Sequence, residues 1–111
     1  MASFSTEREG DLLTVAVEGQ LVVGNRADFK QLVFDQIESG ARRILLDFSG
    51  TAYIDSSGLG ALVSLAKRAR DEGGALHITG LNEDLRTLFE LTRLDTLFKL
   101  FATRGDARAA F

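Results

Sequence analysis

The chain has 111 residues, of which 45% are hydrophobic and 26% charged, and this is the size and composition of one globular domain spanning residues 1–111. Its net charge of −3 argues against a general nucleic-acid or anionic-membrane binder, and the lack of cysteine excludes disulfides, thiol catalysis and thiolate metal sites. Because no apolar run has the length of a membrane span and the N-terminus lacks the plan of a signal peptide, we expect a cytoplasmic protein without direct membrane insertion.

Two strands open the predicted fold. Ser3–Glu7 is expected to form an edge strand, and Gly10 begins a turn into the next one. In Leu13–Val17, apolar side chains alternate with smaller or polar ones, which is the period-2 pattern of a strand with one wetter face. Gly19 is expected to end this second strand.

A loop and a helix follow. Leu21–Gly24 is an apolar connecting loop, and Asn25 is expected to cap the helix after it. Side chains at helical spacing define one face of that helix: Phe29, Leu32, Val33, Gln36 and Ile37. Ser39–Gly40 closes it.

A central strand and a second helix come next. Ile44–Phe48 is an apolar run of strand length, as expected for a strand covered on both faces. The helix after it carries an apolar stripe of Leu59, Leu62, Val63, Ala66 and Ala69. Cations at Lys67, Arg68 and Arg70 complement the dipole in its last turns, and Gly73–Gly74 stops it.

The last third repeats the alternation of strand and helix. Ala75–Thr79 is a short strand, and Asn82 precedes an acidic helix start. Phe98–Phe101 is a last strand, and Thr103 resembles the start of a capping box before a short helix ending at Phe111. This order predicts an α/β fold with a mixed, mostly parallel sheet of four to five strands and about four helices packed against it.

The most informative segment, Ile54–Gly60, joins the central strand to the second helix. Either Asp55 or Ser56 is expected to cap that helix. Because Gly58 and Gly60 have no side chains, they are expected to leave the backbone of the first turn and the Ser56 hydroxyl accessible. A phosphate there would add roughly −1.5 to −2 charges, which a helix N-terminus tolerates. The same residues also suit a plain helix cap after a strand, and spacing alone favours that simpler interpretation.

The chain lacks the residues needed to make this serine a catalyst. The one histidine, His77, lies mid-strand among apolar neighbours, and the glycine-x-serine-x-glycine elbow and the Walker loop are both absent. One histidine without cysteine makes metal ligation unexpected, so we predict a protein that is not an enzyme and has neither metal nor cofactor. Phe101 and Phe111 are left as candidates for an exposed apolar patch.

Four segments carry a family resemblance: Val17–Leu21, Leu46–Gly50, Ile54–Gly60 and Leu91–Phe98. Their order and spacing, over roughly residues 10–110, resemble those of bacterial anti-sigma-factor antagonists of the STAS domain family. The resemblance implies a single STAS-like domain.

The resemblance also implies a partner-switching role. Unphosphorylated members of the family bind an anti-sigma factor, usually a serine kinase with a GHKL-type ATP site, and so release a sigma factor. The kinase phosphorylates the serine after the signature aspartate, here Ser56, and a PP2C-like phosphatase reverses this. ATP and magnesium would belong to the kinase. Eight further residues are implied in partner binding: Asp55, Ser57, Gly58, Leu59, Gly60, Gln20, Val22 and Asn25.

One departure and several alternatives bear on this implied role. Many antagonists carry an aspartate where this chain has Val22, which affects how the first loop meets a kinase. The alternatives are a non-switching STAS scaffold, an accessory part of a transport complex, or a small-ligand or nucleotide sensor that binds an anion at the same helix N-terminus. Transport-associated relatives often lack the serine that is present here as Ser56.

Overall fold

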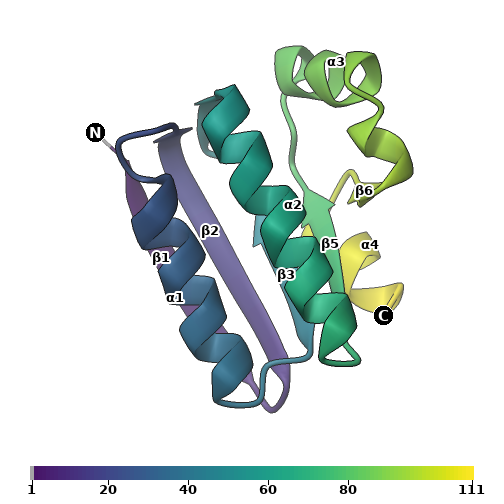
Figure 1. Cartoon of the computed structure of the whole chain (residues 1–111). Coiled ribbons are helices and arrows are strands. Elements are labelled where there is room, and N and C mark those ends of the chain that lie inside the picture. The colour runs from purple at the N-terminus through teal and green to yellow at the C-terminus, as the bar shows by residue number, and fades with distance from the viewer. Residues whose placement is uncertain (1) are drawn as a thin grey trace.

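Six strands form one mixed sheet, and helices cover parts of both of its faces (Figure 1). The computed structural model describes residues 2–111. The strands are β1 (Ser3–Glu9), β2 (Leu12–Leu21), β3 (Arg43–Asp47), β4 (Thr51–Ile54), β5 (Ala75–Thr79) and β6 (Lys99–Phe101). The helices are α1 (Arg26–Glu38), α2 (Ser56–Asp71), α3 (Glu83–Leu91) and α4 (Arg104–Ala109), with a 3-10 turn, η1 (Leu94–Thr96), between α3 and β6.

The sheet has the predicted mixed character. Its strand order is β1-β2-β3-β5-β6, in which β1 runs antiparallel to β2 and the other pairs are parallel. The short strand β4 lies off this path and pairs with the far end of β2. The α/β class is confirmed, and the sheet has one strand more than the four to five expected.

That additional strand changes where β2 ends. The prediction that Gly19 ends the strand is wrong, because β2 continues to Leu21 and there pairs with β4 after a register shift between Gly19 and Gln20. Gly19 has φ +98°, a left-handed conformation that a side chain would strain, so its glycine permits the irregularity. The first half of β2 pairs with β3 and the last residues with β4.

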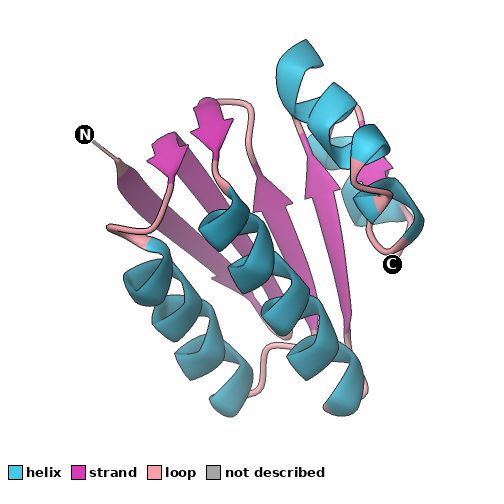
Figure 2. Cartoon of the chain, turned by 45° about the horizontal axis from the view of Figure 1, so that its top comes forward, coloured by secondary structure: helices cyan, strands magenta, loops and turns pink. Residues whose placement is uncertain are grey.

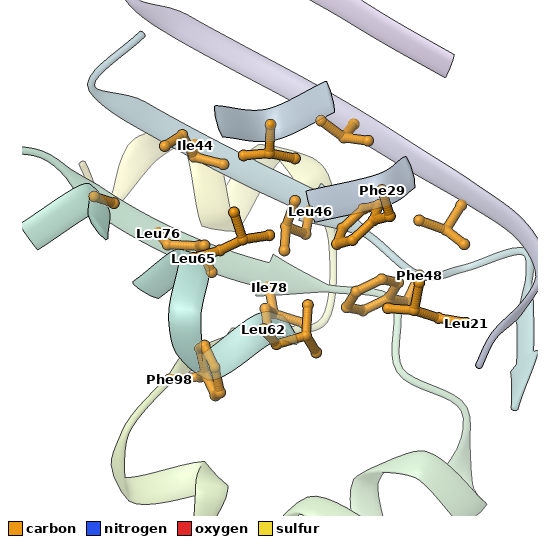
Figure 3. Packing of buried hydrophobic residues seen from close by; sticks show 14 of the residues in the cluster. Leu21, Phe29, Ile44, Leu46, Phe48, Leu62, Leu65, Leu76, Ile78 and Phe98 are labelled. Carbon is orange, nitrogen blue, oxygen red and sulfur yellow. The ribbon is translucent and has the colours of Figure 1, made fainter. Parts of the chain in front are cut away.

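Helices α1 and α2 lie side by side over one face of the sheet (Figure 2). The alternating residues of β2 and the apolar run of β3 meet the helices there, as the sequence pattern predicts. Figure 3 shows Phe29 of α1, Leu46 of β3 and Leu62 of α2 in this layer, and all three are fully buried. Ile54 at the end of β4 and Leu59 near the start of α2 belong to the same cluster, so the core positions the segment that joins them.

Helix α4 covers the opposite face, over β3, β5 and β6. The side chain of His77 points to that face, where Nδ1 lies 2.9 Å from the Ala107 carbonyl oxygen and the ring stacks on Phe111 with centroids 3.8 Å apart. Phe101 contacts the same ring. The structure therefore contradicts an exposed patch at Phe101 and Phe111, because both side chains are half-buried and pack against the His77 ring. His77 has a structural role in this packing.

Ion pairs also connect α4 to the sheet. Arg104 of α4 donates from Nε to Oδ2 of Asp47 at 2.6 Å, and its guanidinium also reaches Glu7 of β1. Burial alone raises the pKa of Asp47, but hydrogen bonds from Arg104 and Ser49 outweigh it and hold that pKa below its ordinary value. The carboxylate thus stays charged and paired at neutral pH.

His77 gives the fold a pH dependence that can be measured. Burial lowers its pKa, the bond with the Ala107 carbonyl raises it, nearby Lys99 lowers it, and the net direction is down. The unfolded chain, with a histidine pKa of about 6.5, then binds the proton at a higher pH than the folded chain does. Stability is therefore complete above about pH 6.5 and falls as the pH drops toward the folded-state pKa.

We expect the urea concentration at the midpoint of unfolding to decrease as the pH is lowered from about 7.5 to about 5.5. We expect His77→Gln to reduce this dependence of the midpoint on pH. The assignment is clean because the sequence contains one histidine. A flat wild-type profile, or an unchanged slope in the variant, would contradict it.

Candidate functional site

The turn between β4 and α2 places a serine at the start of a helix. Asp55 is the N-cap, with extended backbone, and its Oδ1 accepts from the Gly58 amide at 2.8 Å. Ser56 is the first helical residue and is exposed, whereas Ser57 is half-buried. Of the two capping residues that the sequence allowed, the structure therefore selects Asp55 and leaves the Ser56 hydroxyl on the surface.

The Asp55 carboxylate also joins the helix to the loop after β2. Its Oδ2 accepts from the Val23 amide at 3.0 Å, while the Asp55 amide donates to the Leu21 carbonyl at 3.1 Å. One carboxylate oxygen accepts a hydrogen bond from α2, and the other accepts one from the loop. Residues 20–25 and the serine turn are thus held as one unit, although they are about 30 positions apart in the sequence.

Asn25 holds that loop rather than capping α1. It occupies the N-cap position, as predicted, but its side chain makes no capping hydrogen bond. Its Oδ1 accepts from the Val22 amide at 2.9 Å, and its Nδ2 donates to the Gln20 carbonyl at 2.8 Å. The expected role of Asn25 is therefore corrected: it fixes the loop conformation that presents Gln20 and Val22.

The two glycines of the turn have different roles. Gly60 is exposed, and a Cβ built on it would meet nothing within 4 Å, so it leaves the surface open as expected. Gly58 is buried, and a Cβ there would lie 2.5 Å from the Leu21 carbonyl oxygen and 2.8 Å from Cγ2 of Ile54. The expectation that Gly58 opens the first turn is wrong, because its missing side chain allows α2 to pack closely on β2.

Leu59 also lies beneath the site. Its side chain belongs to the apolar core, with 9% of its surface exposed. Together with Gly58 it supports the turn from below and offers no side chain to a docking partner. Of the eight residues implied in partner binding, Gln20 and Gly60 are exposed and Val22, Asn25, Asp55 and Ser57 are half-buried.

Two large exposed side chains, one in the loop that Asp55 holds and one on β4, were not among the eight residues implied in partner binding. Val23 is 65% exposed in the loop that Asp55 holds, and Tyr53 is 53% exposed on β4, where it pairs with Gln20 of β2. The signal for Tyr53 was the strand-forming run Thr51–Ile54, for which the sequence pattern was too short to predict a strand. We call the exposed residues Gln20, Val23, Tyr53, Ser56 and Gly60 the Ser56 surface.

Within residues 2–111, no group of three or more His, Cys, Asp or Glu side chains is placed to hold a metal ion. In the same described residues, no helix is long and apolar enough to cross a membrane.

The fold has counterparts among known proteins. The STAS domain family matches residues 3–107. This chain belongs to the STAS domain family. A Thermotoga maritima relative, named as a candidate anti-sigma factor antagonist, is 31% identical over 98 residues, 87% of each chain. The anti-sigma-B factor antagonist of Staphylococcus aureus is 27% identical over 95 residues, covering 86% of this chain and 88% of the relative.

Solved structures agree with this assignment. The crystal structure of the Thermotoga maritima protein matches with a TM-score of 0.91 at 29% identity, covering 96% of this chain and 92% of the other. The Bacillus protein SpoIIAA in its unphosphorylated form matches with a TM-score of 0.77 at 15% identity, covering 97% and 96% of the two chains, which shows a shared fold. The predicted STAS fold is confirmed, and the Ser56 surface lies at the N-terminal end of α2 in this STAS domain.

Proposed function

We propose that this STAS domain is an anti-sigma-factor antagonist that binds an anti-sigma factor through the Ser56 surface, and that phosphorylation of Ser56 switches this binding off. The observation that carries the proposal is the position of Ser56, exposed at the first residue of α2 and next to an aspartate already used as the cap. Relatives of similar length are named anti-sigma factor antagonists, which supports the choice of partner.

Exposure separates the two serines of the turn. A kinase must reach the hydroxyl oxygen, and Ser56 is exposed whereas Ser57 is half-buried. The first residues of α2 also carry amides without partners inside the helix, and these favour a nearby anion. Ser56 is therefore the better acceptor.

The fold has reason to survive the modification. Both oxygens of the Asp55 carboxylate are engaged, with Gly58 and Val23, so a phosphate next to it need not break the cap to be accommodated. SpoIIAA offers a parallel: its phosphorylated and unphosphorylated forms each match this chain with a TM-score of 0.77. We infer that the phosphate acts by weakening partner binding and not by unfolding the domain.

The neighbours of Ser56 explain how a partner would sense the change. Val23 and Tyr53 supply exposed apolar area of the kind that anchors protein interfaces. A partner packed over these side chains would exclude water from Ser56. A phosphate would then bring roughly −1.5 to −2 charges into a dry interface beside Asp55, and such juxtaposition costs several kcal/mol.

The enzymes of the cycle would be separate proteins. The anti-sigma factor would be a serine kinase with a GHKL-type site for ATP and magnesium, and a PP2C-like phosphatase would restore the free serine. The STAS domain would act in the cytoplasm as substrate and binding partner, without catalysis of its own. Its first loop, with half-buried Val22 and exposed Val23, would favour a kinase with an apolar contact there.

Phosphorylation of a defined serine tests the proposal directly. The chain is incubated with a candidate anti-sigma kinase and magnesium-ATP, and intact-mass and peptide analysis should locate one phosphate on Ser56. Ser57→Ala, the matched control, should still accept one phosphate, whereas Ser56→Ala should accept none. A phosphate on Ser57, or equal modification of both variants, would refute the assignment to Ser56, and no phosphorylation at all would favour a non-switching scaffold.

A further inference from the structure

A groove lies beside the C-terminal half of α2, away from the Ser56 surface. The residues that line it come mainly from α2, from β5 and from the segment entering β6, and its volume is about 370 Å³. This volume is within the range of pockets that bind small molecules, roughly 300–1,000 Å³.

The walls of the groove are apolar. Val63 and Ala66 line it from α2, Leu76 from β5, and Leu97 from the segment before β6. Val63 is 38% exposed and Leu97 45% exposed, so the groove presents two large apolar side chains to water. A ligand with an apolar body would remove this area from water.

The rim of the groove is positively charged. Lys67 and Arg70 line it from α2 and Lys99 from β6, and its lining contains no carboxylate. None of the ion pairs formed within residues 2–111 involves any of these three cations. In a chain of net charge −3, an apolar groove with only cationic charges is complementary to an anion.

Strand β5 contributes backbone groups to the groove. Strand β6 pairs with His77, Ile78 and Thr79 of β5, so the outer edge of β5 has no strand partner at Ala75 and Leu76. Both residues line the groove. The Ala75 amide faces the inner edge, where it donates to the Arg42 carbonyl at 2.8 Å, so the edge amide left for a polar head group is that of Leu76.

We propose that this groove binds a small amphipathic anion, with an apolar body against Val63 and Leu97 and one carboxylate among Lys67, Arg70 and Lys99. A medium-chain fatty acid is the simplest ligand of this class. The proposal does not depend on the proposed function, because the groove and the Ser56 surface occupy different parts of α2.

Decanoate is the probe for a binding test on the full chain. Titration followed by calorimetry and by ¹H–¹⁵N correlation spectra should show saturable binding, with the largest amide shifts at residues 63–70, 74–77 and 97–99. Decanol, which has the same apolar body without the charge, should bind at least fivefold more weakly. Because each exposed charge contact contributes only modestly, Lys67→Gln with Arg70→Gln and Lys99→Gln together should weaken decanoate binding roughly tenfold.

The controls separate this proposal from its alternatives. Lys30→Gln, which removes a lysine on α1 that lies over Phe34 outside the groove, should leave decanoate affinity unchanged. Absence of saturable binding, shifts elsewhere, or equal affinity for decanol would overturn the proposal. Shifts at the same residues that depend on protein concentration and not on decanoate would show that a second copy of the chain occupies the groove, and would also overturn it.

Discussion

Ser56→Asp should weaken binding to the anti-sigma factor by about a hundredfold, whereas Ser56→Ala should bind at least as tightly as the unmodified chain and stay bound in the presence of ATP. The reason is the position of residue 56, which is exposed at the first residue of α2, next to the Asp55 carboxylate that holds the Val23 amide. A carboxylate there would lose its hydration under the partner and lie beside Asp55. Calorimetry with the purified partner measures both affinities.

A matched variant separates charge from size. Ser56→Asn adds nearly the same volume as Ser56→Asp but no charge, so it should lose less than tenfold in affinity. Thermal unfolding of the free variants should show that each remains folded. Two results would contradict the switch: wild-type affinity for Ser56→Asp, or equally weak binding by Ser56→Asn, which would indicate a steric effect.

The fold was predictable where patterns are local. The alternation in Leu13–Val17 and the apolar run Ile44–Phe48 each predicted a strand, and the structure contains both, as β2 and β3. Thr103 accepts from the Asp106 amide at 3.1 Å and caps α4, as the spacing of those two residues indicated. Such signals depend on neighbours in the sequence, so one chain suffices to detect them.

What failed depends on contacts between distant segments. β4 is only four residues long, and it is a strand because Gly19 lets β2 continue beside it. The Asn25 side chain bonds the Gln20 carbonyl because the loop folds back on itself, a geometry that spacing does not indicate. The residues of the turn were identified from the sequence, but their division into exposed and supporting positions required the packing of α2 on β2.

The clearest case is Gly58, and the chain contains its own control. Gly58→Ala and Gly60→Ala are the same substitution in the first turns of one helix, where alanine is intrinsically favoured over glycine by about 1 kcal/mol. At Gly60 the added methyl meets nothing within 4 Å, so this variant should gain about 0.5–1 kcal/mol. At Gly58 the methyl would lie 2.5 Å from the Leu21 carbonyl oxygen, which is backbone and cannot rotate away.

Relief of that clash requires α2 to move away from β2. The Leu21 carbonyl also accepts from the Asp55 amide at 3.1 Å, so the movement disturbs the hydrogen bonds that hold the loop and the serine turn together. Overpacking costs about 1–3 kcal/mol, and a contact with rigid backbone belongs in the upper part of that range, at about 2–3 kcal/mol. Less the helix-propensity gain of about 1 kcal/mol, Gly58→Ala should be destabilised by about 1–2 kcal/mol. Urea unfolding of the two free variants measures the difference, and effects of the same sign would show that Gly58 does not set the distance between α2 and β2. Because the same contact positions Asp55, Gly58→Ala should also weaken partner binding without altering any exposed side chain.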